Sequence, residues 1–293
     1  MMLRIARDTL GAALLLLACV GVLAQPAKPK VPAGVDPGGL AIALITHGVD
    51  YTKPAVAAGL ARDGEGDMIG ADFVDGTQRP FAASNALDDM LVALAPGRVI
   101  PIRVGEGKHL VGIELALVFL KQTATRVVVL PRVLRSKTDW APFVTAAKAW
   151  PSMLFIVAAD DIRDAPGQRC ETAAQLLGDD TPPSALGLEN VMVVASLHSR
   201  VLPCIDASYA WSKPDAIVAP VSALREAPGH ANASPRDAGE AAMLAAGLIP
   251  RYAKELKGAT SAADAKRILL SKAVKLKGLD APVLECCDRP APR

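Results

Sequence analysis

Short runs of apolar residues, each bounded by glycine, proline or polar residues, recur along most of the chain. Their length and β-branched content are typical of strands buried in a parallel sheet. These runs cover residues 40–46, 99–104, 126–130, 154–158, 191–195 and 216–219. Other segments repeat apolar residues at helical spacing: residues 87–94, 110–121, 139–149, 235–256 (interrupted near Gly247 and Pro250) and 262–272. The pattern therefore predicts strands that alternate with helices.

Strands that alternate with helices indicate βαβ units, and hence an α/β fold with a mostly parallel sheet covered on both faces. The chain shows no composition break or long linker after residue 39, so we expect one domain over residues 39–278. The remaining residues, 279–293, are interpreted as a C-terminal tail.

The first residues follow a different pattern, in which Arg4 and Arg7 precede the unbroken apolar or small run 10–24. This run is short for a membrane helix, which needs about 20 residues. A basic start, a short apolar segment and Val-Leu-Ala before position 25 predict a secretory signal peptide over residues 1–24. The protein is therefore expected to be exported, to the periplasm or the medium.

Two alternatives to a cleaved signal peptide stay open. The apolar run could be a membrane anchor, or Cys19 could be a lipidation site after a weak lipoprotein-type cleavage sequence. After cleavage of the signal peptide, residues 25–38, which contain prolines and lysines, are interpreted as a tether. No later segment is long and apolar enough to predict a transmembrane helix in the mature chain.

Composition narrows the function classes. Of 293 residues, 51% are hydrophobic and 21% charged, which is too apolar for a disordered chain. Lys plus Arg number 32 and Asp plus Glu 30, a net charge of +2, which argues against a nucleic-acid partner. Only 4% of residues are aromatic, so Ala, Val, Leu and Ile must form the core.

Cysteines agree with an oxidising compartment, because four of the five lie after the leader. We expect a disulfide between Cys170 and Cys204, which would close a loop of about 35 residues and contribute roughly 3–4 kcal/mol. Cys286 and Cys287 are adjacent, which strains a bond between them, so we expect thiols or bonds to another chain. No CxxC spacing is present, and no metal site is predicted from the cysteines.

Several segments, in one order along the chain, are similar to the motifs of a single family. IALITHGVDYTKP (42–54) is similar to V-x-V-L-D-T-G-I-D-x-x-H-P, and GHANASPRDAG (229–239) to G-T-S-M-A-x-P-H-V-A-G. Weaker matches lie at residues 71–75, 95–104, 112–114, 183–185, 190–194 and 207–212. The chain thus resembles the subtilisin-like serine proteases, or subtilases. The resemblance implies a three-layer αβα fold with a mostly parallel central sheet.

The resemblance also demands four functional residues, and each position is substituted. Thr46 stands at the position of the catalytic Asp, and Ser84 at the approximate position of the catalytic His. Ala231 replaces the nucleophilic Ser, and Asp161 replaces the Asn that stabilises the oxyanion. Loss of one triad member costs about 10⁴–10⁶ in rate, and loss of an oxyanion donor about 10²–10³. The residues predict a subtilase fold without subtilase chemistry.

This combination favours a secreted pseudopeptidase that binds a peptide or protein through the old groove. His230 and Asp160 are candidate binding residues beside it, with ordinary loop residues as the alternative reading. Another hypothesis is a serine endopeptidase with rearranged catalytic residues, using Ser84 or Ser234 with an Asp from the pair at 160–161. A further one is a structural domain that has lost the groove.

No cofactor is predicted. The aspartate pairs at 88–89, 160–161 and 179–180 could hold calcium, although solvated loop charges are the preferred interpretation. Because parallel sheets carry functional positions at the carboxyl ends of strands, we expect Thr46, Ser84 and Ala231 to converge around one cleft.

Overall fold

The computed structural model describes residues 27–83, 89, 92, 97–105, 112–123, 125–131, 137–158, 188–196, 215–220, 238–252, 261–275 and 281–286. The chain divides between Lys30 and Val31 into two compact units, and the second unit, Val31–Arg293, contains every named helix and strand.

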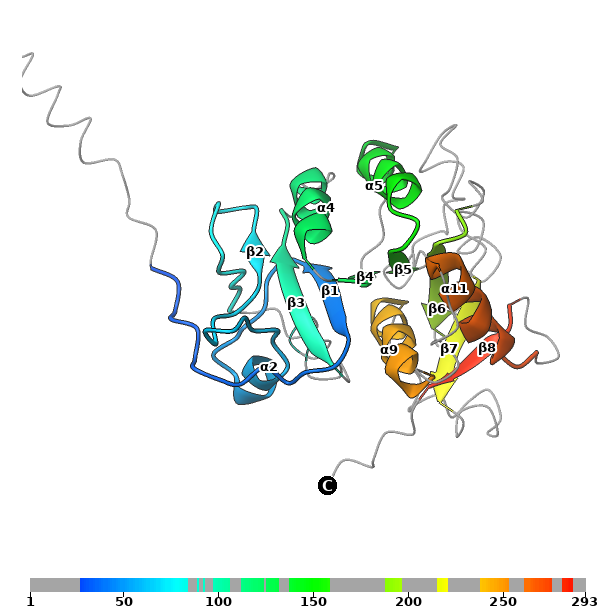
Figure 1. Cartoon of the computed structure of the whole chain (residues 1–293), viewed down its shortest axis with the longest axis horizontal. Coiled ribbons are helices and arrows are strands. Elements are labelled where there is room, and N and C mark those ends of the chain that lie inside the picture. The colour runs from blue at the N-terminus through cyan, green and yellow to red at the C-terminus, as the bar shows by residue number, and fades with distance from the viewer. Residues whose placement is uncertain are drawn as a thin grey trace, which may run out of the picture. The chain divides into compact units, whose positions relative to one another are not determined.

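An eight-stranded sheet forms the middle of this unit, with strand order β2-β3-β1-β4-β5-β6-β7-β8 (Figure 1). All seven pairings between neighbouring strands are parallel. The strands are β1 (Ala41–Thr46), β2 (Ala71–Asp72), β3 (Arg98–Arg103), β4 (Val127–Leu130), β5 (Leu154–Ala158), β6 (Val191–Ser196), β7 (Ala216–Pro220) and β8 (Val283–Cys286). The predicted α/β class with a mostly parallel sheet is confirmed.

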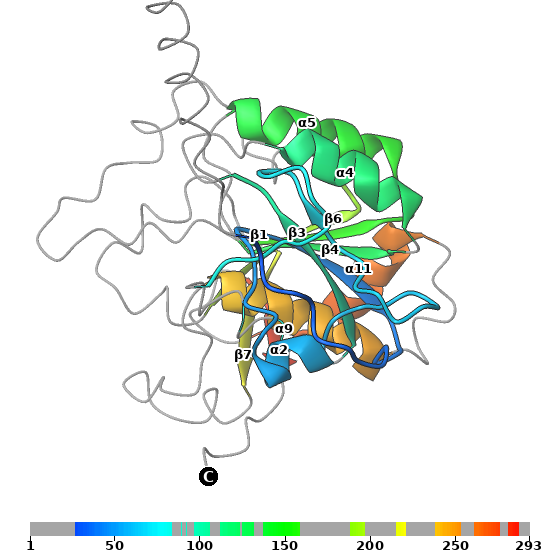
Figure 2. The same ribbon diagram turned by 90° about the vertical axis from the view of Figure 1, so that its left-hand side faces the viewer.

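Side chains alternate between the two faces of the sheet, as the pleat of a strand requires. In β1, Ile42 and Leu44 enter one core cluster, and Ala43 and Ile45 enter the other. One cluster includes residues of α2 (Pro54–Ala58), α9 (Ala238–Arg251) and α11 (Ala262–Ser271). The other includes residues of α4 (Ile113–Gln122) and α5 (Lys137–Ala149). Figure 2 shows the helices on the two sides of the sheet, so the three-layer αβα arrangement is confirmed.

Helix α9 continues through Gly247, where the sequence predicted an interruption, and ends at Arg251, directly after Pro250, where it predicted another. Ala241, Ala242, Ala245 and Ala246 of α9 are fully buried in the core. This burial outweighs the helix penalty of a single glycine, about 1 kcal/mol. Pro250 lies in the last turn and removes only one hydrogen bond near the end of the helix.

Three short elements were not predicted: α2, β2 and β8. Strand β8 lies within residues 279–293, which the sequence indicated as a tail, and it pairs with β7 at the edge of the sheet. The folded part of the chain therefore extends to Cys286. That residue is 2% exposed, so its thiol is not accessible for the expected bond to another chain.

The expected tether needs a similar correction. Val31 packs against the core, and Asp36 accepts hydrogen bonds from the backbone of Gly38 and of Arg62. Residues 31–38 thus belong to the folded unit, and only residues before Val31 lie outside it.

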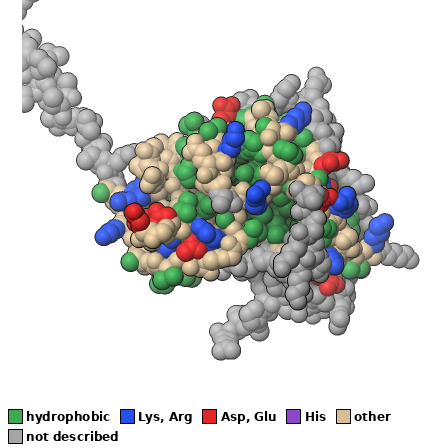
Figure 3. Space-filling view, viewed as in Figure 1, with side chains coloured by type: hydrophobic (Ala, Val, Ile, Leu, Met, Phe, Trp, Pro, Cys, Tyr) green, Lys and Arg blue, Asp and Glu red, His purple; other side chains and the backbone are tan. Residues whose placement is uncertain are grey.

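Within the described residues, no helix has the length and apolar character needed to cross a bilayer. On the face shown in Figure 3, Lys and Arg side chains lie among Asp and Glu side chains and do not form a single stripe.

Candidate functional site

Most of the residues singled out in the sequence lie outside the described residues: Ser84, Asp160, Asp161, Cys170, Cys204, His230 and Ala231. Of the four positions at which the family resemblance demands a catalytic or oxyanion residue, the described residues include Thr46, which is the last residue of β1. The candidate site is therefore described from the carboxyl ends of β1, β3 and β2, the edge where parallel sheets place functional groups.

Three side chains meet at one level across these strands. Arg103 ends β3 and is in register with Thr46 of β1 on one side and Asp72 of β2 on the other. Two backbone hydrogen bonds extend the pairing, from Val104 N to Thr46 O (2.9 Å) and from Phe73 N to Arg103 O (2.9 Å). The sheet itself therefore places Thr46 next to a charged pair.

Thr46 is fully buried, and its hydroxyl is used within its own turn. The hydroxyl oxygen accepts a hydrogen bond from Gly48 N at 3.0 Å and donates one to Gly48 O at 3.3 Å. Such side-chain contacts two residues ahead are typical of Ser and Thr turns. Threonine thus supplies the acceptor that shapes the turn but no carboxylate to orient a histidine.

Gly48 is required at this turn. Its φ is +113°, a region that residues with a Cβ rarely adopt. An added Cβ would also lie 2.8 Å from the Cβ of Ala82 and 3.1 Å from Cδ of Arg103. The glycine therefore lets the turn after β1 approach both neighbours.

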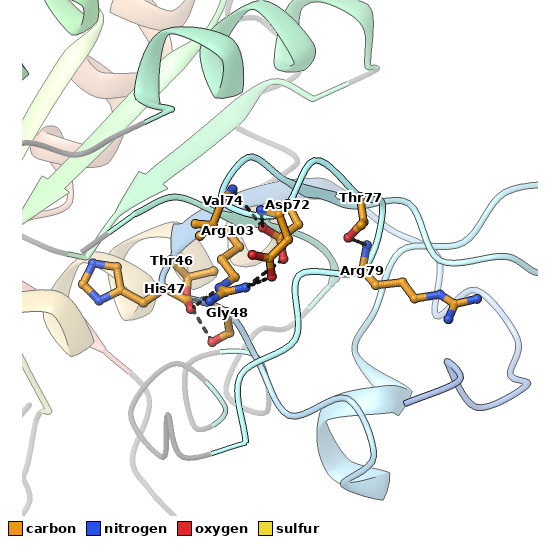
Figure 4. A network of polar contacts seen from close by, with 9 residues as sticks. Thr46, His47, Gly48, Asp72, Val74, Thr77, Arg79 and Arg103 are labelled. Carbon is orange, nitrogen blue, oxygen red and sulfur yellow. Dashed lines mark hydrogen bonds and ion pairs between the residues drawn. The ribbon is translucent and has the colours of Figure 1, made fainter. Parts of the chain in front are cut away.

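Arg103 connects this turn to two carboxylates (Figure 4). Its Nη1 donates to Asp72 Oδ2 at 3.0 Å and to Asp75 Oδ2 at 2.7 Å, and its Nε donates to His47 O at 3.1 Å. Asp72 is nearly fully buried, and its other oxygen accepts from Val74 N and Asp75 N. Figure 4 shows the His47 ring extending away from the guanidinium.

Electrostatics favour the charged form of this arginine. Burial alone would lower the pKa of Arg103, but hydrogen bonds and charge from Asp72 and Asp75 raise it above its usual value. An arginine that is permanently charged and bonded to two carboxylates cannot act as an acid or base. It holds the β2 turn against the turn after β1.

The chain on either side of Ser84 is also held against the loop that follows Thr46. Before it, Ala82 N donates to Val49 O at 3.3 Å. After it, Asp89 Oδ1 accepts from Asp50 N at 2.6 Å, and Asp89 Oδ2 accepts from Lys53 Nζ at 2.6 Å. Asp89 and Val92 are helical, as predicted for residues 87–94. These contacts hold Ala82 and Asp89 against the loop of residues 49–53. Ser84 and Ala231 lie outside the described residues, so their approach to Thr46 stays a prediction.

The interaction of Arg103 with Asp72 and Asp75 was not predicted, although both segments were recognised as family-like. A signal was present, because each segment places a charged residue at the end of an apolar run. Their pairing depends on β2 and β3 being neighbours, which sequence order does not reveal. In the described part of the chain, no three His, Cys, Asp or Glu residues are grouped as a metal site would require.

No protein-family model matches the chain, and no curated protein sequence does. Solved structures do match. A cold adapted subtilisin-like serine proteinase is 16% identical, with a TM-score of 0.52 over 90% of this chain and 95% of the other. A lanthipeptide protease is 17% identical, with a TM-score of 0.50 over 81% of this chain and 80% of the other. Together with the parallel eight-stranded sheet and its two helical layers, this likeness identifies the fold of the chain as subtilisin-like.

Proposed function

We propose that this protein is an exported, subtilisin-like pseudopeptidase that binds a peptide or a protein segment without cleaving it. The observation that carries the proposal is the state of Thr46. At the end of β1, where the family resemblance requires a carboxylate, a buried hydroxyl is bonded to the backbone of Gly48.

The other family positions support the same conclusion. Acyl transfer needs a nucleophile, a general base and donors for the oxyanion. Ala231 has no hydroxyl, Ser84 has no basic group, and an ionised Asp161 would repel the oxyanion. Because no histidine occurs between His47 and His109, a shift of the alignment within that segment does not supply a base.

We infer retained binding by analogy of fold, because a peptide groove depends on the fold and not on the triad. Both structural relatives named above are proteases, so the fold is compatible with holding an extended peptide. His230 and Asp160 are the proposed contacts beside the old site. The proposal includes export directed by residues 1–24 and a disulfide between Cys170 and Cys204. It requires no cofactor.

Hydrolysis tests the catalytic half of the proposal. We expect the purified protein to leave casein and chromogenic peptides intact and to remain unlabelled by a fluorophosphonate, with an active subtilisin-like protease as the positive control. The single change Ala231→Ser should not restore activity, because the base, its orienting group and the oxyanion donor are still absent. Only the combination Thr46→Asp, Ser84→His, Ala231→Ser and Asp161→Asn supplies all four groups.

Inhibitor-sensitive turnover by the unmodified protein would contradict the proposal. If Ser234→Ala then abolished that turnover, the chain would be a serine endopeptidase with rearranged catalytic residues.

Binding is tested separately, by selecting from a library of extended peptides on the immobilised protein and measuring affinity by fluorescence anisotropy. We expect His230→Ala and Asp160→Asn to weaken binding of the selected peptide, by about tenfold for the loss of one charge-assisted contact. Glu65→Gln is the matched control, because this exposed carboxylate lies in the 63–67 turn, away from the strand ends of the site. Failure to select any peptide would favour a structural domain.

A further inference from the structure

A carboxylate of the segment before β1, that of Asp36, binds three parts of the chain. Asp36 Oδ2 accepts a hydrogen bond from Arg62 N at 2.7 Å and lies 3.3 Å from Arg98 Nη2. Asp36 Oδ1 accepts from Gly38 N at 2.7 Å. The same carboxylate thus contacts its own segment, the chain near Arg62 and the first residue of β3.

The side chain of Arg62 binds the backbone of this segment. The residue is only 3% exposed, and its guanidinium donates to Pro32 O at 3.0 Å and to Gly66 O at 2.8 Å. Gly34 lies against this guanidinium, since a Cβ added to Gly34 would be 2.7 Å from Arg62 Nη2 and 2.8 Å from Arg62 Cζ. The buried guanidinium therefore fits a chain that has a carbonyl at Pro32 and no side chain at residue 34.

The partners of this segment exist only in the folded domain. Arg98 begins β3, and Arg62 lies just beyond Ala61, whose backbone N donates to Val99 O at 2.8 Å. Val31 packs against the core cluster that contains Ile42 and Leu44 of β1. Docking of the segment is thus coupled to the formation of the β1–β3 region.

We propose that residues 31–38 form a strap that docks on Arg62 and Arg98 when the domain folds and then shields the adjacent backbone from proteolysis. This inference concerns the amino ends of β1 and β3 and does not rest on the peptide-binding function. In an exported protein, a proline-containing segment next to a leader would otherwise be an open target for proteases.

The bond between Val35 and Asp36 gives a sharp test. Val35 is 87% exposed, so exposure alone predicts fast cleavage by an endoproteinase that cuts before aspartate. The strap predicts slow cleavage, because Asp36 must first leave its partners. We expect the folded protein to be cut at this bond at least about tenfold more slowly than a synthetic peptide of residues 31–40.

Gly34→Ala should release the strap, because its methyl group displaces the guanidinium of Arg62. The matched control is Gly64→Ala, since no atom lies within 4 Å of a Cβ added there. Cleavage before Asp36 should be about tenfold faster in Gly34→Ala and unchanged in Gly64→Ala. Equal rates in the two variants, or a folded protein cut as fast as the peptide, would overturn the inference.

Hydrogen exchange keeps the test valid if Gly34→Ala folds poorly. In Asp36→Ala, the amides of Gly38 and Arg62, which lose their acceptor, should exchange faster while amides within β4 and β5 keep their protection. Unchanged exchange at Gly38 and Arg62 would also overturn the inference. Peptide binding should be the same in all these variants, because the strap lies at the opposite ends of the strands from Thr46.

Discussion

The two ends of β3 carry the same pair of residue types in different settings. At the carboxyl end, Arg103 donates to two aspartates, and the side chain of Asp72 is fully buried. At the amino end, Arg98 lies 3.3 Å from Asp36, and both side chains keep about a quarter of their surface exposed, 28% and 24%. Arg103 and Asp75 are also partly exposed, 23% and 21%, so the difference between the two ends is the fully buried carboxylate of Asp72.

This difference shows how burial decides the importance of an ion pair. A partly exposed pair contributes little, because water competes for both charges. A buried carboxylate depends on its partner, because it cannot return to water when the partner is removed. We therefore expect the carboxyl end to be a fixed platform for the candidate site and the amino end to be a reversible attachment for the strap.

Arg103→Ala should have the largest effect on stability. Removal of the guanidinium leaves Asp72 buried without its counter-charge, and we expect a loss of about 3 kcal/mol in the free energy of unfolding. Denaturant titration measures the change. Arg103→Lys keeps the charge but loses the forked geometry, so its loss should be smaller. A loss below that of Arg98→Ala would contradict the comparison between the two ends.

Thr46→Val should have the next largest effect. The substitution keeps the shape of the side chain but leaves the buried backbone N of Gly48 without its acceptor, at a cost of about 1–2 kcal/mol. Thr46→Ser keeps the hydroxyl and is the control. Equal stability of the Thr46→Val variant and the unmodified protein, in thermal and denaturant unfolding, would show that the hydroxyl does not stabilise this turn.

The smallest effect is expected for Arg98→Ala, below about 1 kcal/mol near neutral pH. Its signature should lie in the pH dependence. Burial raises the pKa of Asp36. Hydrogen bonds from Arg62 and Gly38 and the charges of Arg98 and Arg62 together lower it by more, so the net pKa lies below the usual 3.8. A carboxyl whose pKa is lowered by folding stabilises the protein above pH 3.8, and this contribution is lost as the pH falls through the folded pKa.

Stability measured between pH 6 and pH 2 should therefore fall less steeply in Arg98→Ala than in the unmodified protein. Asp36→Asn should remove this part of the pH dependence altogether. Identical pH profiles for all three proteins would show that Asp36 is not held by these partners.

The sequence by itself determined the six inner strands of the sheet. Its six predicted strands are those buried on both faces, and a strand in that position must be a continuous apolar run such as 127–130 or 154–158. The family motifs likewise placed Thr46 at the end of the first strand. Strand β8 was not predicted because four residues are too few to show the alternation or apolar run of a strand. They are buried because β8 pairs with β7.

Tertiary structure decided the contacts between charged residues. Asp72 and Arg103 are 31 residues apart, and Asp36 and Arg62 are 26 apart. Periodicity reports which face of an element is buried, but it does not report which elements become neighbours. The order of β2, β3 and β1 brings these partners together. Because of the same order, residues 31–38, part of the expected tether, belong to the folded domain.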